Sequence, residues 1–113
     1  MLALLCTACA KQGGWLKHAV GGTVAVAQAD GRCDDRGVSK GTRVTISGSE
    51  GKLLGVTHLG AAQPDEGRHR CVYRFAFTGI PSSDRYSLSV AGRTSIYTQA
   101  DLQLKNWFVN LTG

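Results

Sequence analysis

The strongest constraint on the fold is an alternation of apolar and polar side chains with a period of two residues. It is clearest in the segment Cys71-Val-Tyr-Arg-Phe-Ala-Phe77, whose odd-numbered residues are all cysteine or aromatic. A strand with one buried face has this period, whereas a helix requires a period of about 3.6 residues. We therefore expect a central strand that places the side chains of Cys71, Tyr73, Phe75 and Phe77 in the core.

The same alternation recurs in short segments that turn-forming sequences separate. We expect strands at residues 23–27, 43–47, 52–59, 71–77, 85–90, 95–98 and 106–112. Gly48-Ser-Glu-Gly51 is expected to form a hairpin turn, and Thr98 to cap a short helical turn. Residues 60–70 are expected to form a loop, and residues 79–84 to end the central strand.

About seven strands at a spacing of roughly ten residues fit one small domain. The chain has 113 residues and 15 glycines, and this glycine content favours tight turns over long helices. We predict an all-β fold, a small antiparallel β-sandwich of transthyretin or immunoglobulin type. The core is expected to contain Val24, Val44, Ile46, Tyr73, Phe75, Phe77, Tyr86, Leu88, Val90, Trp107 and Val109.

The first nine residues form an apolar run, which is too short to cross a bilayer and matches the end of a signal peptide. Leu5-Cys-Thr-Ala-Cys9 resembles a bacterial lipobox, in which the final cysteine is lipidated, although Cys6 replaces the usual leucine. An ordinary secretory signal and a redox pair of Cys6 and Cys9 are the alternatives. We expect residues 1–9 to be a signal and lipobox remnant, 10–22 a tether, and 23–113 the β-sandwich domain.

Several motifs resemble a family of actinobacterial secreted or lipoprotein domains that is largely uncharacterised. The resemblance lies in Val44-Thr-Ile-Ser-Gly-Ser-Glu-Gly-Lys-Leu-Leu-Gly55, Cys71–Phe77, Gly79-Ile-Pro81, Asp84–Val90 and Gly92-Arg93. The strand order is also similar to that of transthyretin-like and carboxypeptidase-regulatory-like sandwiches. This resemblance implies an exported β-sandwich and supplies no catalytic residues.

The cysteines support export independently of that resemblance. With Cys6 and Cys9 assigned to the signal, Cys33 and Cys71 remain in the folded part. An exported location makes a disulfide between them the natural state. Two buried free thiols are the alternative, and zinc ligation is a weaker one.

The basic balance of the chain does not by itself indicate a nucleic-acid partner. The net charge is +5, from 13 Lys and Arg against 8 Asp and Glu, and the basic residues are scattered. Only Arg68, Arg70 and Arg74 lie close together, and a nucleic-acid module would need them on one face with exposed aromatic rings. We expect no nucleic-acid partner and keep a weak nucleic-acid-binding β-barrel as an alternative.

Candidate catalytic and metal residues are few. His69 and Cys71 would share a strand face and reach one metal, but a loop histidine beside a disulfide explains the pattern better. Serine-hydrolase elbows, phosphate-binding loops and zinc-protease helices are missing from the sequence. We predict no enzyme activity and no cofactor. A small secreted enzyme, or a metal or ligand site using His58 and His69, is the alternative.

These observations predict an exported, lipid-anchored interaction module at the bacterial cell envelope, located outside the cytoplasm. Its partner is expected to be an envelope or membrane protein, or another envelope component. The mixed charges between the first two expected strands are typical of a surface that a protein partner recognises. The candidate partner residues are Arg32, Asp34, Asp35, Arg36 and Lys40, and the candidate lipidation site is Cys9.

Overall fold

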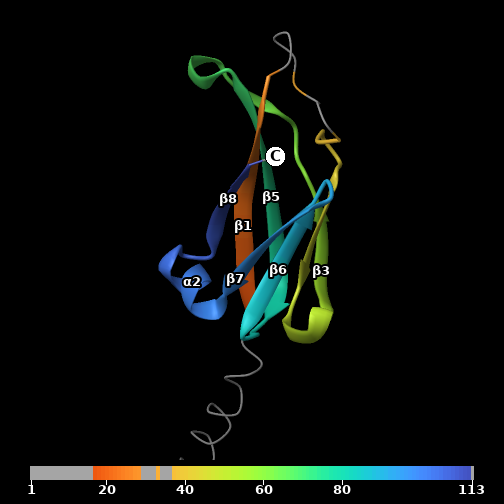
Figure 1. Cartoon of the computed structure of the whole chain (residues 1–113), viewed down its shortest axis with the longest axis vertical. Coiled ribbons are helices and arrows are strands. Elements are labelled where there is room, and N and C mark those ends of the chain that lie inside the picture. Colours follow the sequence, from red (N-terminus) through yellow and green to blue (C-terminus); the bar gives the residue numbers. More distant parts are fainter. Residues whose placement is uncertain (1–16, 29–32, 34–36, 113) are drawn as a thin grey trace, which may run out of the picture.

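The computed structural model describes residues 17–28, 33 and 37–112, and the following statements concern these residues. Two four-stranded sheets pack face to face, with strand orders β4-β5-β1-β8 and β3-β2-β6-β7 (Figure 1). The strands are β1 (Lys17–Ala27), β2 (Arg43–Ser47), β3 (Leu53–His58), β4 (Gln63–Asp65), β5 (Arg70–Pro81), β6 (Arg85–Val90), β7 (Arg93–Thr98) and β8 (Phe108–Thr112). The predicted all-β sandwich is confirmed.

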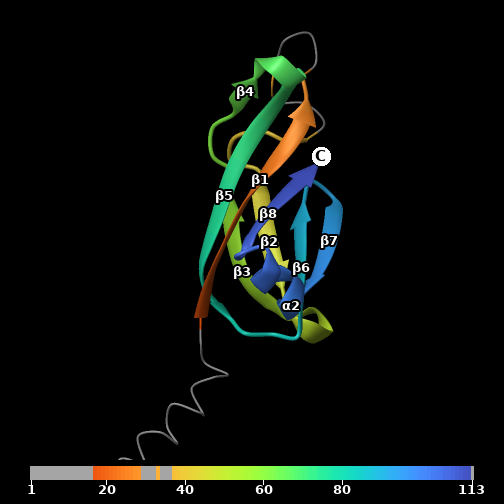
Figure 2. The same ribbon diagram turned by 90° about the vertical axis from the view of Figure 1, so that its left-hand side faces the viewer.

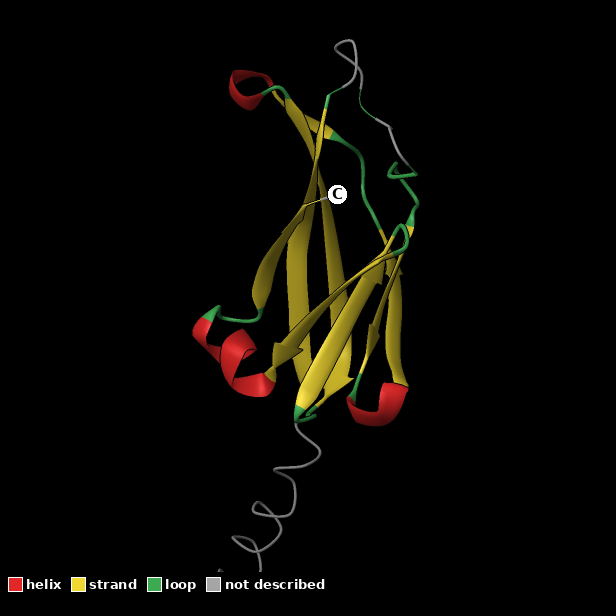
Figure 3. Ribbon diagram, in the orientation of Figure 1, coloured by secondary structure: helices red, strands yellow, loops and turns green. Residues whose placement is uncertain are grey.

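Three short helical segments lie at the ends of strands, as Figure 3 shows. They are the 3₁₀ turns η2 (Ser49–Gly51) and η3 (Glu66–Arg68) and the helix α2 (Gln99–Leu104). The turn η2 occupies the predicted hairpin between β2 and β3. No helix among the described residues is both long and apolar enough to cross a membrane.

The inward face of β5 is the centre of the core. Cys71 and Tyr73 are fully buried and Phe75 and Phe77 nearly so, as the alternation predicts. The other predicted core residues are buried too, except Trp107, which is partly buried and packs against the cluster. The core also contains buried residues that were not predicted, among them Val20, Val38, Leu59, Ile80 and Leu102.

A disulfide joins Cys33 to Cys71, and the two Cα atoms lie 5.7 Å apart. Cys71 pairs with Val26 at the end of β1, so the bond fastens the segment after β1 to the beginning of β5. Cys71 is completely buried and Cys33 is partly buried against the core, so the bond lies at the edge of the core. The predicted disulfide is confirmed.

The predicted boundary between tether and domain at residue 23 is wrong. Strand β1 begins at Lys17, and Val20 within it is buried. Gly22 lies where β1 meets β8 so closely that a Cβ atom there would come within 2.3 Å of the Val109 carbonyl oxygen. A Gly-Gly pair is typical of a flexible linker, but here it permits close packing of strands. The β1–β8 pair is also parallel, in a sandwich expected to be antiparallel.

Two further expectations about local structure are corrected. Strand β5 continues through Pro81 rather than ending at Gly79, and Ile80 pairs with His18 and is buried. Part of the expected loop at residues 60–70 is the edge strand β4, which lies beside β5 (Figure 2). Pro64 in β4 has no N–H to donate, which suits an edge strand. Because a proline argues against a strand, the sequence pattern did not predict β4.

Helix α2 carries the chain from β7 in one sheet to β8 in the other. The Thr98 side chain accepts a hydrogen bond from the Asp101 N–H, and the Asp101 carboxylate accepts one from the Thr98 N–H. The hydrogen bond from the Thr98 backbone, assisted by its side chain, lowers the pKa of Asp101. The predicted Thr98 cap is confirmed, and Leu102 ties the helix to the core.

Gly22→Ala tests whether the glycines belong to the sheet. We expect the new methyl group to clash with the backbone of β8 and to lower the free energy of unfolding by at least about 2 kcal/mol. Gly21→Ala is the matched control, because a Cβ atom there meets only ordinary contacts of 3.6 Å or more. Its stability should lie within about 1 kcal/mol of the wild type. Urea titration of both variants measures the free energy of unfolding. Equal stabilities would mean that residues 21 and 22 belong to a tether and not to the sheet.

Phe75→Ala tests the orientation of β5. Removing this buried ring should cost about 3 to 5 kcal/mol of stability. Phe108→Ala is the control, since 48% of that side chain is exposed, and it should cost about 1 kcal/mol or less. Thermal unfolding followed by circular dichroism gives both values. Similar losses would contradict the assignment of the buried face.

Candidate functional site

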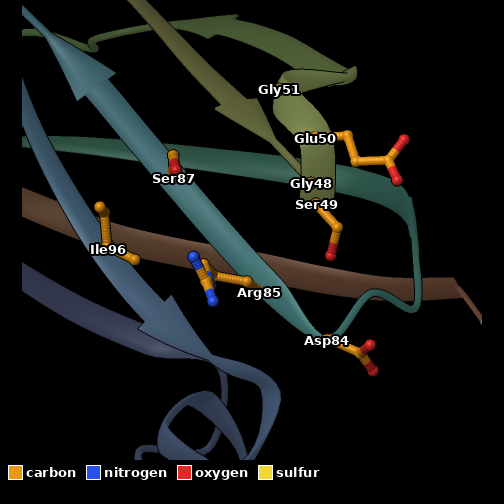
Figure 4. Close-up of a pocket in the computed structure, with 8 residues that line it drawn as sticks. All are labelled: Gly48, Ser49, Glu50, Gly51, Asp84, Arg85, Ser87 and Ile96. Atoms are coloured by element: carbon orange, nitrogen blue, oxygen red, sulfur yellow. The ribbon is translucent and has the colours of Figure 1, made fainter.

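A pocket of about 340 Å³ lies where the β2–β3 turn meets the beginning of β6 (Figure 4). It is open to solvent. Its walls are the β2–β3 turn, the beginning of β6 and the neighbouring strand β7 of the same sheet. The residues that line it are Gly48, Ser49, Glu50, Gly51, Asp84, Arg85, Ser87 and Ile96.

The turn that forms one wall is held in place by serine hydroxyls. Glu50 and Gly51 both have positive φ angles, 64° and 77°, which fold the chain back tightly. The Ser49 N–H donates to the Ser83 hydroxyl at 3.1 Å, and the two serine hydroxyls lie 3.2 Å apart. The Ser83 hydroxyl also donates to the Arg85 carbonyl at 3.0 Å. Ser83 therefore joins the turn to the first residue of β6.

Tyr86 fixes the position of Ser83. Its buried hydroxyl donates to the Pro81 carbonyl at 3.1 Å and accepts from the Ser83 N–H at 2.8 Å. Burial raises the pKa of this hydroxyl, an effect that the Ser83 hydrogen bond partly offsets. A tyrosine bonded to backbone a few residues upstream, the tyrosine corner, recurs in β-sandwiches. Here it holds the crossover from β5 to β6 and, through Ser83, the pocket wall.

The charges of the pocket are separated in space. The Arg85 side chain extends across the sheet toward Ile96, while the carboxylates of Glu50 and Asp84 point the other way (Figure 4). Within the described part of the chain, the ion pair found is Arg70 with Asp65, at 3.2 Å. The guanidinium of Arg85 and the hydroxyl of Ser87 line the pocket as groups for a polar ligand, while the Ser49 hydroxyl is shared with Ser83.

The lining of the pocket is mostly polar. Its described lining includes serines and carboxylates but no histidine, cysteine or lysine that would activate a serine hydroxyl. The ring of His18 instead stacks on Trp107, with ring centroids 3.9 Å apart, and its Nε2 lies 3.0 Å from the Ser82 hydroxyl. In the pocket itself, the serine hydroxyls, the carboxylates and the Arg85 guanidinium supply hydrogen-bonding and charged groups.

Most residues of the predicted partner surface lie outside the described part of the chain. These are Arg32, Asp34, Asp35 and Arg36, and the predicted lipidation site Cys9 is outside it too. Lys40 is described and is exposed in the turn that follows Val38. Their proposed role stays a prediction.

The two histidines of the alternative metal or enzyme site are both exposed. His58 ends β3 opposite Arg43, and His69 occupies a left-handed turn before β5, with φ of 52°. Cys71 is bonded to Cys33, so it has no thiolate to share a metal with His69. Among the described residues, no group of three or more His, Cys, Asp and Glu is placed to hold a metal ion. Cys71 is therefore not a metal ligand, and His69 is a turn residue beside a disulfide, which is the interpretation that the sequence favoured.

The alternative nucleic-acid site lacks the exposed aromatic rings that it would need on β5. Arg70, which is paired with Asp65, and Arg74 both lie on the outer face of this strand. The aromatic rings of this strand, Tyr73, Phe75 and Phe77, are buried in the core. Bases would find no stacking surface on this strand.

The lining residues of the pocket were not predicted as a site. Each has an ordinary local explanation in the sequence, as a turn or strand residue, and only strand pairing brings them together. Residues 48–51 were predicted only as a hairpin turn, and Asp84-Arg-Tyr86, which spans the start of β6, only as part of the family resemblance.

Searches with protein-family models, curated proteins and solved structures found no match to this chain.

Tyr86→Phe tests the role of the buried hydroxyl. We expect a loss of about 1 to 3 kcal/mol, because the Ser83 N–H and Pro81 carbonyl each lose a partner. The amide protons of Ser49 and Ser83 should also exchange faster with solvent. Tyr97→Phe on the neighbouring strand β7 is the control, opposite Tyr86 in register. Equal effects of the two variants on stability and exchange would contradict this assignment.

Proposed function

We propose that this protein is an exported, non-catalytic binding module of the bacterial cell envelope, held there by a lipid on Cys9. The observation that carries the proposal is the Cys33–Cys71 disulfide. Disulfides persist in oxidising compartments outside the cytoplasm and are rare inside it.

The surroundings of the disulfide favour a structural role for it. Cys71 is completely buried at the beginning of the central strand. Redox-active cysteines are partially exposed and lie in electropositive surroundings. A bond anchored on the buried Cys71 across a sequence separation of 38 residues instead stabilises the fold, by about 3 to 4 kcal/mol in the chain-entropy model. A small domain that depends on such a bond is suited to an oxidising compartment.

A lipid anchor would bring the pocket close to the membrane. Since β1 begins at Lys17, the proposed tether shortens to residues 10–16, which span at most about 25 Å. Lys17 pairs with Pro81, beside the crossover that holds the pocket wall. In Figure 1 the beginning of β1 lies at the same end of the sandwich as α2. An envelope component near the membrane is therefore the natural ligand of the pocket.

We also propose membership of the actinobacterial secreted and lipoprotein group, with its transthyretin-like pattern. The residues that carry this resemblance lie on β2, β3, β5 and β6 and their turns. These strands contribute much of the core, and the β2–β3 turn and β6 also line the pocket. The resemblance supports a binding domain, because that group supplies no catalytic residues to compare.

Metabolic labelling with a fatty-acid analogue tests the anchor. We expect the wild-type chain to be labelled and to sediment with membranes, and Cys9→Ala to lose both properties. Cys6→Ala is the control and should be labelled as the wild type is. Label that persists in Cys9→Ala would contradict lipidation at this cysteine. Accumulation of the wild-type chain in the cytoplasm would overturn export itself.

Replacing both disulfide cysteines by serine tests their structural role. The double variant Cys33→Ser/Cys71→Ser should be less stable than the oxidised wild type by about 3 to 4 kcal/mol in guanidinium titration. The wild type with reductant should fall to a similar stability. If neither change moved the unfolding midpoint, the bond would be dispensable and its support for export would disappear.

A further inference from the structure

The outward face of the sheet β3-β2-β6-β7 carries two rows of hydroxyl groups. Strand pairing sets Thr45 opposite Ser89, and Ser89 opposite Thr94, in one row. The next row contains Ser47 opposite Ser87. We call these residues the hydroxyl face: Thr45, Ser47, Ser87, Ser89 and Thr94.

The charge on this sheet has a single sign. None of its four strands contains an acidic residue. Arg43, Arg85 and His58 are exposed at outward positions, with His58 opposite Arg43. The carboxylates of Glu50 and Asp84 lie beyond the strand ends and point away from Arg85 (Figure 4). An anion is therefore favoured on this face.

The two arginines lie at opposite ends of the hydroxyl face. Arg43 precedes Thr45 on β2, and Arg85 precedes Ser87 on the antiparallel strand β6. At the usual rise of about 3.3 Å per residue, about 20 Å of sheet separates them. One small ion cannot contact both, so a ligand that uses the whole face must be extended and carry repeated anionic groups.

The rest of the face suits a chain rich in hydroxyl groups. Serine and threonine hydroxyls both donate and accept hydrogen bonds, as sugar and polyol hydroxyls do. The exposed side chains of Leu53, Val56 and Ile96 border the face and would contact the carbon atoms of such a chain. Arg85, Ser87 and Ile96 also line the pocket, so the face and the pocket are continuous.

We propose that the hydroxyl face binds an anionic, polyhydroxylated polymer, with carboxylate or phosphodiester groups on Arg43 and Arg85. A guanidinium donates two parallel hydrogen bonds to either group. The polymer runs along β2 and β6, and its end enters the pocket, where Glu50 and Asp84 repel any further anion. This inference rests on the proposed envelope location, where polymers of both kinds are available to an exported protein.

Binding of defined polymers to the full chain tests the proposal. Polygalacturonate supplies carboxylates, poly(glycerol phosphate) supplies phosphodiesters, and dextran is the neutral control. We expect calorimetric binding of at least one anionic polymer and none of dextran. The polymer that binds more tightly identifies which anion the face prefers.

Arginine variants locate the binding surface. Arg43→Gln/Arg85→Gln should weaken polymer binding at least about tenfold, because both guanidinium contacts are lost. Arg74→Gln is the matched control, since Arg74 is an exposed strand arginine on the outer face of the other sheet. Its affinity should stay within about twofold of the wild type. Circular dichroism checks that all variants are folded.

A second pair of variants places a negative charge on each sheet. Ser87→Asp should abolish binding, whereas Thr78→Asp, exposed on β5 in the other sheet, should leave it unchanged. Equal losses in the matched variants, or equal binding of duplex DNA, would overturn the proposal in favour of non-specific attraction. If neither anionic polymer binds while the protein is still exported and lipidated, the inference fails and the proposed function stands.

Discussion

A covalent bond, Cys33–Cys71, fastens the end of the sandwich where β1 leaves its sheet and β5 enters it. From Cys71 onward, the inward residues of β5 fill the space between the sheets, and β1 pairs along nearly the whole of β5. The bond lowers the conformational entropy of the unfolded chain, because it closes the loop between the end of β1 and the beginning of β5. An oxidising environment favours this bond, which is consistent with the proposed location outside the cytoplasm.

The opposite end of the sandwich is organised by hydrogen bonds. Two connections between the sheets lie there, and hydrogen bonds stabilise each of them. The Tyr86 hydroxyl donates to the Pro81 carbonyl in the connection from β5 to β6. Thr98 and Asp101 cap α2, which precedes β8. The serine that Tyr86 fixes is also the one that positions the pocket turn. Tyr86 therefore holds both the crossover and, through Ser83, one wall of the pocket.

Local patterns predicted the features that local physics determines. Alternation identified the strands and the buried face of β5, and a threonine three residues before an aspartate identified the α2 cap. The start of β1 within the expected tether was missed because the close packing of Gly22 against Val109 is a long-range contact. Strand β4 was missed because its three residues include a proline. The hydroxyl face depends on the register of the three strands β2, β6 and β7, which no local pattern specifies.

The most direct test of the link between fold and compartment is peptide mass mapping of the full chain isolated from cells. Free thiols are blocked during lysis, before any oxidation in air, and the protein is digested without reductant. We predict one linked peptide pair containing Cys33 and Cys71, with both cysteines inaccessible to the blocking reagent. Blocked thiols at Cys33 and Cys71 in the isolated protein would contradict the disulfide and, with it, the inferred location outside the cytoplasm.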